Sequence, residues 1–308
     1  SKCLISQRTF CGYDSQSQGT ANIKKLKMNY QEVNMEFRTL VDIASPDFFI
    51  EPEHRILTVG SCFADHLGRK FRDEAFVADV NPYGVMYNPA SILHTVERYG
   101  EAVDVAILTL GTNHVYREKA TGEIVDNCQK RPQALFQEEV LSVDVCRDYL
   151  LKAIQVLRSR NPHTKIIITV SPIRYAKYGY HGSQLSKAAL LLAVDSLMRD
   201  SDFGKAGGVY YFPAYEIVND ELRDYRFYAP DMLHPSQQAV DYIWERFVDI
   251  VFSDSAREYL REWKPVKEAL AHRPFNPDSD AYRSFLARTM EQKKCLSDKY
   301  PHLKSIKQ

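Results

Sequence analysis

The sequence lacks the features that mark several large classes of protein. Among its 308 residues, Lys and Arg together number 40 and Asp and Glu also number 40, so the formal net charge is zero. Proteins that bind duplex nucleic acid or anionic membranes usually carry a basic excess, so we expect no nucleic-acid partner. The longest apolar runs, at 105–110 and 165–170, are far shorter than the roughly 20 residues of a membrane span.

Cysteine pairs and an apolar leader are also missing. The six cysteines show neither the spacing of zinc ligands nor that of a disulfide framework, so we expect a reduced, cytoplasmic protein without a metal site. The first twenty residues are rich in Ser and Gln and contain no apolar segment typical of a secretory signal. We expect residues 1–34 to form a polar, disordered extension.

From residue 54 onward, short apolar runs alternate with amphipathic stretches. The runs end close to a Gly or Pro and predict buried strands at 55–59, 76–80, 103–110, 165–170 and 209–212. Helical periodicity predicts helices at 91–99, 138–159, 183–199 and 236–252, and Thr121-Gly122 indicates an inserted hairpin at 114–127. Continuous apolar strands alternating with helices are typical of a parallel sheet covered on both faces.

This pattern predicts one doubly wound α/β domain at 35–252, followed by a C-terminal tail at 253–308. The tail has two helical patterns, at 255–272 and 280–296, separated by prolines. We expect these helices to pack on the domain.

Polar residues follow the predicted strands, at the edge where open parallel sheets bind ligands. Ser61 and Cys62 follow the first strand, where a helix begins, and the N-terminus of a helix stabilises a thiolate or an oxyanion. Taken alone, the same pair also fits a tight turn with Ser61 as the helix N-cap and Cys62 as a buried apolar residue. The residues around Ser61 and Cys62 alone leave both interpretations open.

Asp231 and His234 have the spacing of a catalytic pair. A carboxylate three residues before an imidazole can bind one ring nitrogen and leave the other to accept a proton from a nucleophile. The alternative is a capping Asp and a surface His ahead of the next helix. Asn113 and the backbone N–H of Gly84 are suited to donate to an oxyanion, although each is also a common turn residue.

Three charged residues near the same edge are candidates for substrate binding. They are Arg174, Lys187 and Glu216. Arg174 is suited to bind a carboxylate or phosphate, but structural ion pairs explain all three equally well.

These residues resemble the signature blocks of a known family. Residues 60–64, Gly-Ser-Cys-Phe-Ala, resemble the motif after which the GSCFA domain family is named, and 171–174, 184–187 and 215–235 are similar to that family as well. The resemblance spans roughly Met35 to the mid-250s. It implies membership of the SGNH (GDSL-like) hydrolases, with a flavodoxin-like α/β/α sandwich, a parallel five-stranded sheet and strand order 2-1-3-4-5.

The resemblance also implies roles for individual residues. Asp231 and His234 correspond to the Asp-x-x-His pair, and Gly84 and Asn113 to the oxyanion donors. The hydrolases carry Gly-Asp-Ser where this chain carries Gly60-Ser61-Cys62, so an ungapped comparison places Cys62 at the nucleophile, with Ser61 as the alternative.

We therefore expect an esterase or deacylase that forms a covalent acyl-enzyme and uses no cofactor. Its substrate is expected to be a small-molecule or carbohydrate ester. Two alternatives remain: an acyltransferase that uses the same site, and a non-catalytic module that binds a glycan or acyl group through a degenerate nucleophile site.

Overall fold

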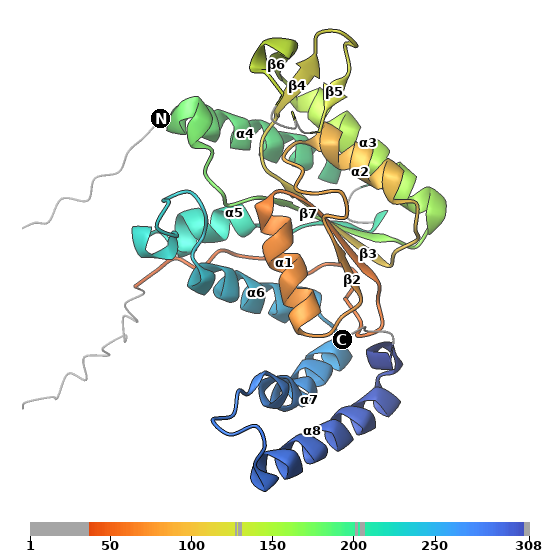
Figure 1. Cartoon of the computed structure of the whole chain (residues 1–308). Helices are drawn as coiled ribbons and strands as arrows, with labels where there is room; N and C mark the ends of the chain where they lie inside the picture. The colour runs from red at the N-terminus through yellow and green to blue at the C-terminus, as the bar shows by residue number, and fades with distance from the viewer. Residues whose placement is uncertain (1–36, 127, 129–130, 201–202, 204–206, 305–308) are drawn as a thin grey trace, which may run out of the picture. The chain divides into compact units, whose positions relative to one another are not determined.

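A parallel five-stranded sheet forms the centre of the molecule (Figure 1). The computed structural model describes residues 37–126, 128, 131–200, 203 and 207–304, so the extension predicted at 1–34 lies outside the described residues. The strands are β1 (Ile56–Gly60), β2 (Ala78–Val80), β3 (Val105–Leu110), β7 (Lys165–Val170) and β8 (Val209–Tyr211). Their order is β2-β1-β3-β7-β8 and every neighbouring pair is parallel, which confirms the predicted sheet and its strand order.

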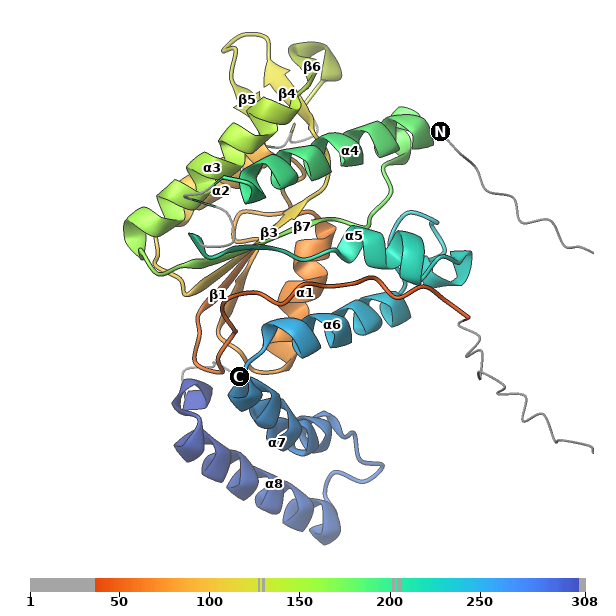
Figure 2. The same ribbon diagram turned by 180° about the vertical axis from the view of Figure 1, so that it is seen from behind.

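Helices cover both faces of this sheet (Figures 1 and 2). One face carries α1 (Cys62–Asp73) and α6 (Gln237–Val251), and the other carries α2 (Pro89–Tyr99), α3 (Val143–Arg160) and α4 (Gly179–Met198). Successive residues of β3 belong to opposite cores: Ile107 packs with the α1 side and Leu108 with the α2–α4 side. Burial on both faces explains why the strands are continuous apolar runs rather than alternating ones, and the α/β/α sandwich is confirmed.

A small antiparallel sheet is inserted between β3 and α3. It contains β4 (His114–Glu118), β5 (Ile124–Val125) and β6 (Phe136–Val140), in the order β5-β4-β6. The predicted helix start at 138 is therefore wrong, because residues 138–140 pair with β4. The helix begins only at Val143, where the Ser142 hydroxyl accepts the N–H of Val145 as an N-cap. Asn127, the predicted end of the hairpin, is outside the described residues.

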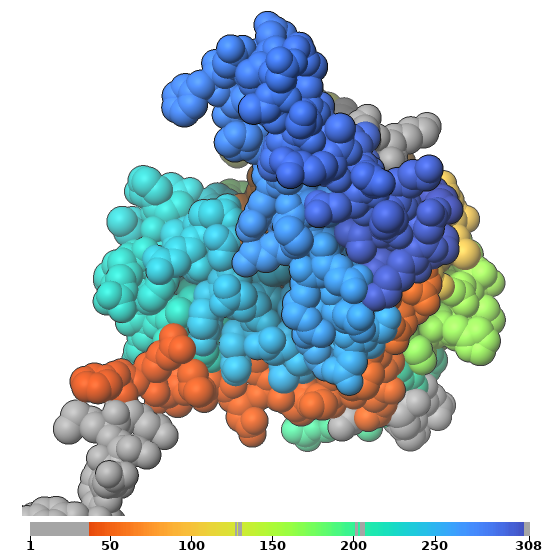
Figure 3. Space-filling view, turned by 90° about the horizontal axis from the view of Figure 1, so that it is seen from below, coloured from red at the N-terminus to blue at the C-terminus, as the bar shows by residue number. Residues whose placement is uncertain are grey.

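Two terminal segments pack against the α1–α6 face. The segment before β1 lies beside α6, where Arg246 donates to the carbonyl of Val41 and Ile50 pairs with Phe252 (Figure 3). The C-terminal helices are α7 (Asp254–Ala271) and α8 (Asp280–Lys299), and the hydroxyl of Tyr259 on α7 donates to the carbonyl of Glu74. None of the helices in the described ranges combines the length and apolarity that a membrane crossing requires.

His302, just after α8, makes the stability of this packing dependent on pH. Its ring is 7% exposed, packs against Phe76 and Tyr259, and has no hydrogen-bond partner for either nitrogen among the described residues. Burial lowers the pKa of His302 below its ordinary value of 6.5. The folded state therefore binds the proton less well than the unfolded state, so stability is full above pH 6.5 and falls as the pH drops below it.

We expect the free energy of unfolding to fall by about 1 kcal/mol more between pH 7.5 and pH 5.5 in the native chain than in His302→Phe. The phenyl ring keeps the aromatic packing but cannot be protonated. Urea unfolding followed by circular dichroism at both pH values measures the difference. An equal fall in the two proteins would show that His302 is not the titrating group.

Candidate active site

The turn from β1 into α1 separates Ser61 from Cys62. The Ser61 hydroxyl accepts the N–H of Phe63 at 3.2 Å and lies 3.1 Å from the hydroxyl of Thr109, and the residue is 1% exposed. Ser61 is thus the N-cap of α1, with its side chain turned inward. Cys62 is the first residue of the helix and is partly exposed, and its Sγ lies 3.8 Å from the hydroxyl of Tyr87.

Gly60 and Asn81 hold this turn in place. Gly60 has a φ of +141°, and a Cβ at this position would stand 2.1 Å from the carbonyl oxygen of Thr109. Its N–H donates to Oδ1 of Asn81 at 2.9 Å, and Nδ2 of Asn81 donates to Asp65 at 2.6 Å. Asn81 was not among the predicted site residues, although the Asn-Pro that follows β2 is a signal that could have marked it.

Asp231 and His234 form the expected pair. Oδ2 of Asp231 lies 2.6 Å from Nδ1 of His234, and Oδ1 accepts the backbone N–H groups of Leu233 and His234 at 2.9 and 3.0 Å. These hydrogen bonds lower the pKa of Asp231 to about 2, so it is a carboxylate at all ordinary pH values. Nε2 of His234 has no hydrogen-bond partner in the described part of the chain, and the side chain is 37% exposed.

His234 acts electrostatically on α1, through His66. His66 lies four residues after Cys62, which places the two side chains on the same face of the helix. Burial, Arg69 and His234 together lower the pKa of His66, so the two imidazoles lie within electrostatic range of each other. Cys62 and His234 are not directly hydrogen-bonded: within the described residues, the partner of Sγ is Tyr87.

A row of aromatic rings runs from Cys62 to the inserted sheet. Tyr87 meets Tyr175 edge-on at 5.8 Å, Tyr175 stacks on Tyr178 at 5.6 Å, and Tyr178 stacks on His114 at 3.6 Å. Burial and the neighbouring Cys62 raise the pKa of Tyr87 to about 12, so its phenol remains a proton donor. This row was not predictable from local sequence, because its members come from three separate segments of the chain.

The comparisons with known proteins identify the family. Residues 55–104 and 95–247 match the GSCFA family, and residues 263–306 match the C-terminal domain of GSCFA domain proteins. The chain belongs to the GSCFA family. No curated protein matches it.

Three solved structures illustrate the structural likeness. The first is a protein from Lactobacillus plantarum, with 13% identity, a TM-score of 0.44, and coverage of 66% of this chain and 100% of that one. The second is a carbohydrate esterase of family 3 from Talaromyces cellulolyticus, with 10% identity, a TM-score of 0.38, and coverage of 68% and 98%. The third is a protein assigned as a GDSL-like lipase from Bacteroides ovatus ATCC 8483, with 15% identity, a TM-score of 0.40, and coverage of 68% and 55%.

In this GSCFA protein, the two expected oxyanion donors differ in availability. The N–H of Gly84 donates to the carbonyl of Asn81 at 2.8 Å, so a turn already uses it. Asn113 is 3% exposed, and Nδ2 donates one hydrogen to the carbonyl of Leu141 at 2.8 Å. The amide of Asn113 therefore keeps a second hydrogen to donate.

The three charged candidates of the GSCFA chain lie in different surroundings. Lys187 is buried, and its ammonium donates to the carbonyls of Gly111 at 2.6 Å and Ser171 at 2.8 Å, which ties the ends of β3 and β7 together. Burial lowers its pKa to about 7. Lys187 is therefore not placed to contact a substrate, because its ammonium is enclosed by protein.

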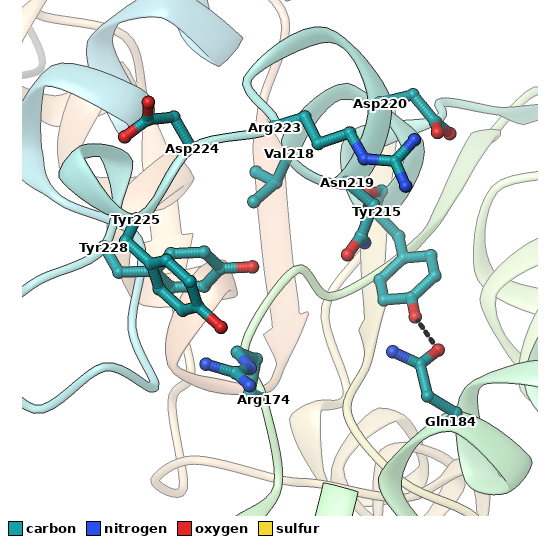
Figure 4. Close-up of a pocket in the computed structure, with 10 residues that line it drawn as sticks. All are labelled: Arg174, Gln184, Tyr215, Val218, Asn219, Asp220, Arg223, Asp224, Tyr225 and Tyr228. Atoms are coloured by element: carbon teal, nitrogen blue, oxygen red, sulfur yellow. Dashed lines mark hydrogen bonds between the residues drawn. The ribbon is translucent and has the colours of Figure 1, made fainter. Parts of the chain in front are cut away.

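Glu216 and Arg174 line separate cavities. Glu216 accepts the hydroxyl of Tyr211 and lines a cavity beside residues 41–45, whereas Arg174 lines a cavity of about 520 Å³ next to the His234 loop. Figure 4 shows this second cavity, with Arg174 at one side and Arg223 across from it. The structure therefore brings Arg174, but not Glu216, beside the Asp231–His234 pair.

Proposed function

We propose that this chain is an SGNH-type acyl-transfer enzyme that hydrolyses esters, with Cys62 as the nucleophile and His234 as the general base. The observation that carries the proposal is the Asp231–His234 pair, whose Nε2 is unpartnered within the described residues and whose imidazole lies within electrostatic range of His66, one helical turn after Cys62. Nucleophilic catalysis requires an oriented imidazole that can reach a thiol, and a helix N-terminus favours the thiolate.

The reaction proceeds in two steps through a thioester. Nε2 of His234 takes the proton of the Cys62 thiol, and the thiolate attacks the ester carbonyl. The carbon–oxygen bond to the alcohol then breaks, and His234 returns the proton to the departing alkoxide. In the second step His234 takes a proton from water and the hydroxide attacks the thioester carbonyl. The carbon–sulfur bond then breaks to release the carboxylic acid, and His234 returns the proton to the Cys62 thiolate. Asp231 holds the imidazole and stabilises its charged form.

Three donors are suited to bind the oxyanion of the tetrahedral intermediate. The N–H of Cys62 is at the first position of α1, where a helix has no internal acceptor for it. The remaining amide hydrogen of Asn113 is the second donor, and the phenol of Tyr87, 3.8 Å from Sγ, is the third. We leave Gly84 out of this set, because its N–H is bound in a turn.

The surroundings of Ser61 favour Cys62 as the nucleophile. The Ser61 hydroxyl is buried and engaged with Phe63 and Thr109, so an attacking role would require α1 to lose its cap. The partly exposed Cys62 needs no such change. The aromatic row that begins at Tyr87 places partly exposed rings near Cys62, and such rings are suited to contact a carbohydrate or other ring-bearing ester.

One observation favours a second candidate, a non-catalytic binding module. The hydrogen-bond partner of Sγ is Tyr87 rather than His234, and a crevice that only binds a glycan or acyl group needs no contact between thiol and imidazole. The two candidates predict different reactivity for the thiol.

Alkylation by iodoacetamide at pH 7 separates them. We expect Cys62 to react at least roughly 10-fold faster than Cys146, which is fully buried and has a pKa raised to about 12 by burial. The rate at Cys62 should fall in His234→Ala, because the imidazole no longer takes the thiol proton. Peptide mapping over a time course gives both rates. A rate at Cys62 that does not depend on His234 would favour the binding module.

A further inference from the structure

Two arginines in the cavity next to the His234 loop form no ion pair within the described part of the chain. It has a volume of about 520 Å³, and its lining includes Arg174 and Arg223 (Figure 4). In the described ranges, neither guanidinium has a carboxylate oxygen within 4.0 Å. Arginines that line a cavity without an acidic partner are suited to bind an anion from outside.

The aromatic rings around Arg174 fix its position without cancelling its charge. The guanidinium carbon lies 4.0 Å from the ring centre of Tyr180, 5.4 Å from that of Tyr228 and 6.0 Å from that of Tyr225. Cation–π contacts hold a guanidinium in place while its formal charge remains. Two of these tyrosines, Tyr225 and Tyr228, also line the cavity and add hydroxyl donors.

Two carboxylates, those of Asp220 and Asp224, also line the cavity. Asp224 accepts the N–H of Arg226 at 2.9 Å and has Arg226 as its charged neighbour. Asp220 acts electrostatically on Tyr215 and Glu216. Figure 4 shows both carboxylates on the same side of the cavity as Arg223 and away from Arg174.

Arg174 also connects the cavity to the catalytic loop. Its backbone N–H donates to the carbonyl of Leu233 at 3.0 Å, and its Nη1 donates to the carbonyl of Met232 at 3.0 Å. Both acceptors lie between Asp231 and His234, so a ligand that binds Arg174 lies directly behind the loop that carries the general base.

We propose that this cavity binds an oxyanion, a carboxylate or a phosphate carried by the ester substrate, through Arg174 and Arg223. That the anion belongs to a substrate rests on the proposed function, whereas the binding of an anion does not depend on catalysis. The cavity then selects acidic esters over neutral ones, because it holds the charged end of the ester while the ester bond lies on the other side of the His234 loop.

Arg223→Gln is the variant that tests the site, because Arg223 holds no part of the His234 loop. The matched control is Arg283→Gln, which removes the same charge from a residue that pairs with Asp280, and neither of these residues lines the cavity. The probes are inorganic phosphate and succinate, each titrated into the protein by isothermal calorimetry. We expect one of the two to bind, with a Kd about 10-fold weaker in Arg223→Gln and unchanged in Arg283→Gln.

The probe that binds identifies the group: phosphate indicates a phosphorylated substrate, and succinate a carboxylate-bearing one. Failure of both probes to bind, or an equal weakening in the two variants, would overturn the proposal.

A second measurement separates this site from the proposed chemistry. The kcat/KM for the mono-p-nitrophenyl ester of succinic acid should fall about 10-fold in Arg223→Gln, while that for p-nitrophenyl acetate stays the same. Anion binding without any ester turnover would contradict the proposed function alone. Ester turnover without anion binding would contradict the cavity alone.

Discussion

Replacing Cys62 by alanine is expected to reduce the turnover of p-nitrophenyl acetate to the background rate, a loss of roughly 10³-fold or more. The variant removes the sulfur that forms the thioester, and no other side chain at the start of α1 can replace it, because the Ser61 hydroxyl is buried against Thr109. Release of p-nitrophenol measures the rate.

Ser61→Ala is the matched control for this prediction. It should keep most of the turnover but lower the free energy of unfolding by about 1 kcal/mol, because α1 loses its N-cap. The opposite result, with turnover lost in Ser61→Ala and kept in Cys62→Ala, would make Ser61 the nucleophile and would require its side chain to leave the position observed here.

Gly60→Ala is expected to destabilise the protein by on the order of 3–5 kcal/mol, or to prevent folding. A Cβ at residue 60 would stand 2.1 Å from the carbonyl oxygen of Thr109 in the neighbouring strand, and the φ of +141° is rare for residues with a side chain. Neither strain can be relieved without separating β1 from β3. Urea unfolding measures the loss.

The control for this substitution is Gly122→Ala. Gly122 also has a positive φ, of +76°, but its Cβ would have no neighbour within 4 Å, so the expected cost is about 1 kcal/mol from backbone conformation alone. Equal costs at the two positions would show that close packing against Thr109 is not what requires glycine at residue 60.

The parts of the fold that were predictable are those that depend on local pattern. The central strands β1 and β3 are fully buried and almost entirely apolar, and the turn between Asp231 and His234 is set within four residues, so both could be predicted without knowledge of the tertiary structure. Residues 138–140 were assigned wrongly, because helical periodicity extended past the true N-cap at Ser142 into a strand that pairs with β4.

The contacts that surround Cys62 were not predictable in the same way. Tyr87 reaches Cys62 from the loop before α2, and Tyr175 reaches Tyr87 from the loop after β7. These contacts depend on how the loops cross over the sheet edge. Lys187 was predicted as a possible substrate contact because of its charge. Its side chain instead points into the protein and binds two backbone carbonyls.

The measurement that tests the central claim most directly is the intact mass of the protein after a brief incubation with p-nitrophenyl acetate. We expect one added acetyl group, which peptide mapping places on Cys62, and its absence in Cys62→Ala and in His234→Ala. An adduct that forms on several cysteines regardless of His234, or no adduct in the native chain, would contradict the account and favour a crevice that binds its ligand without reacting with it.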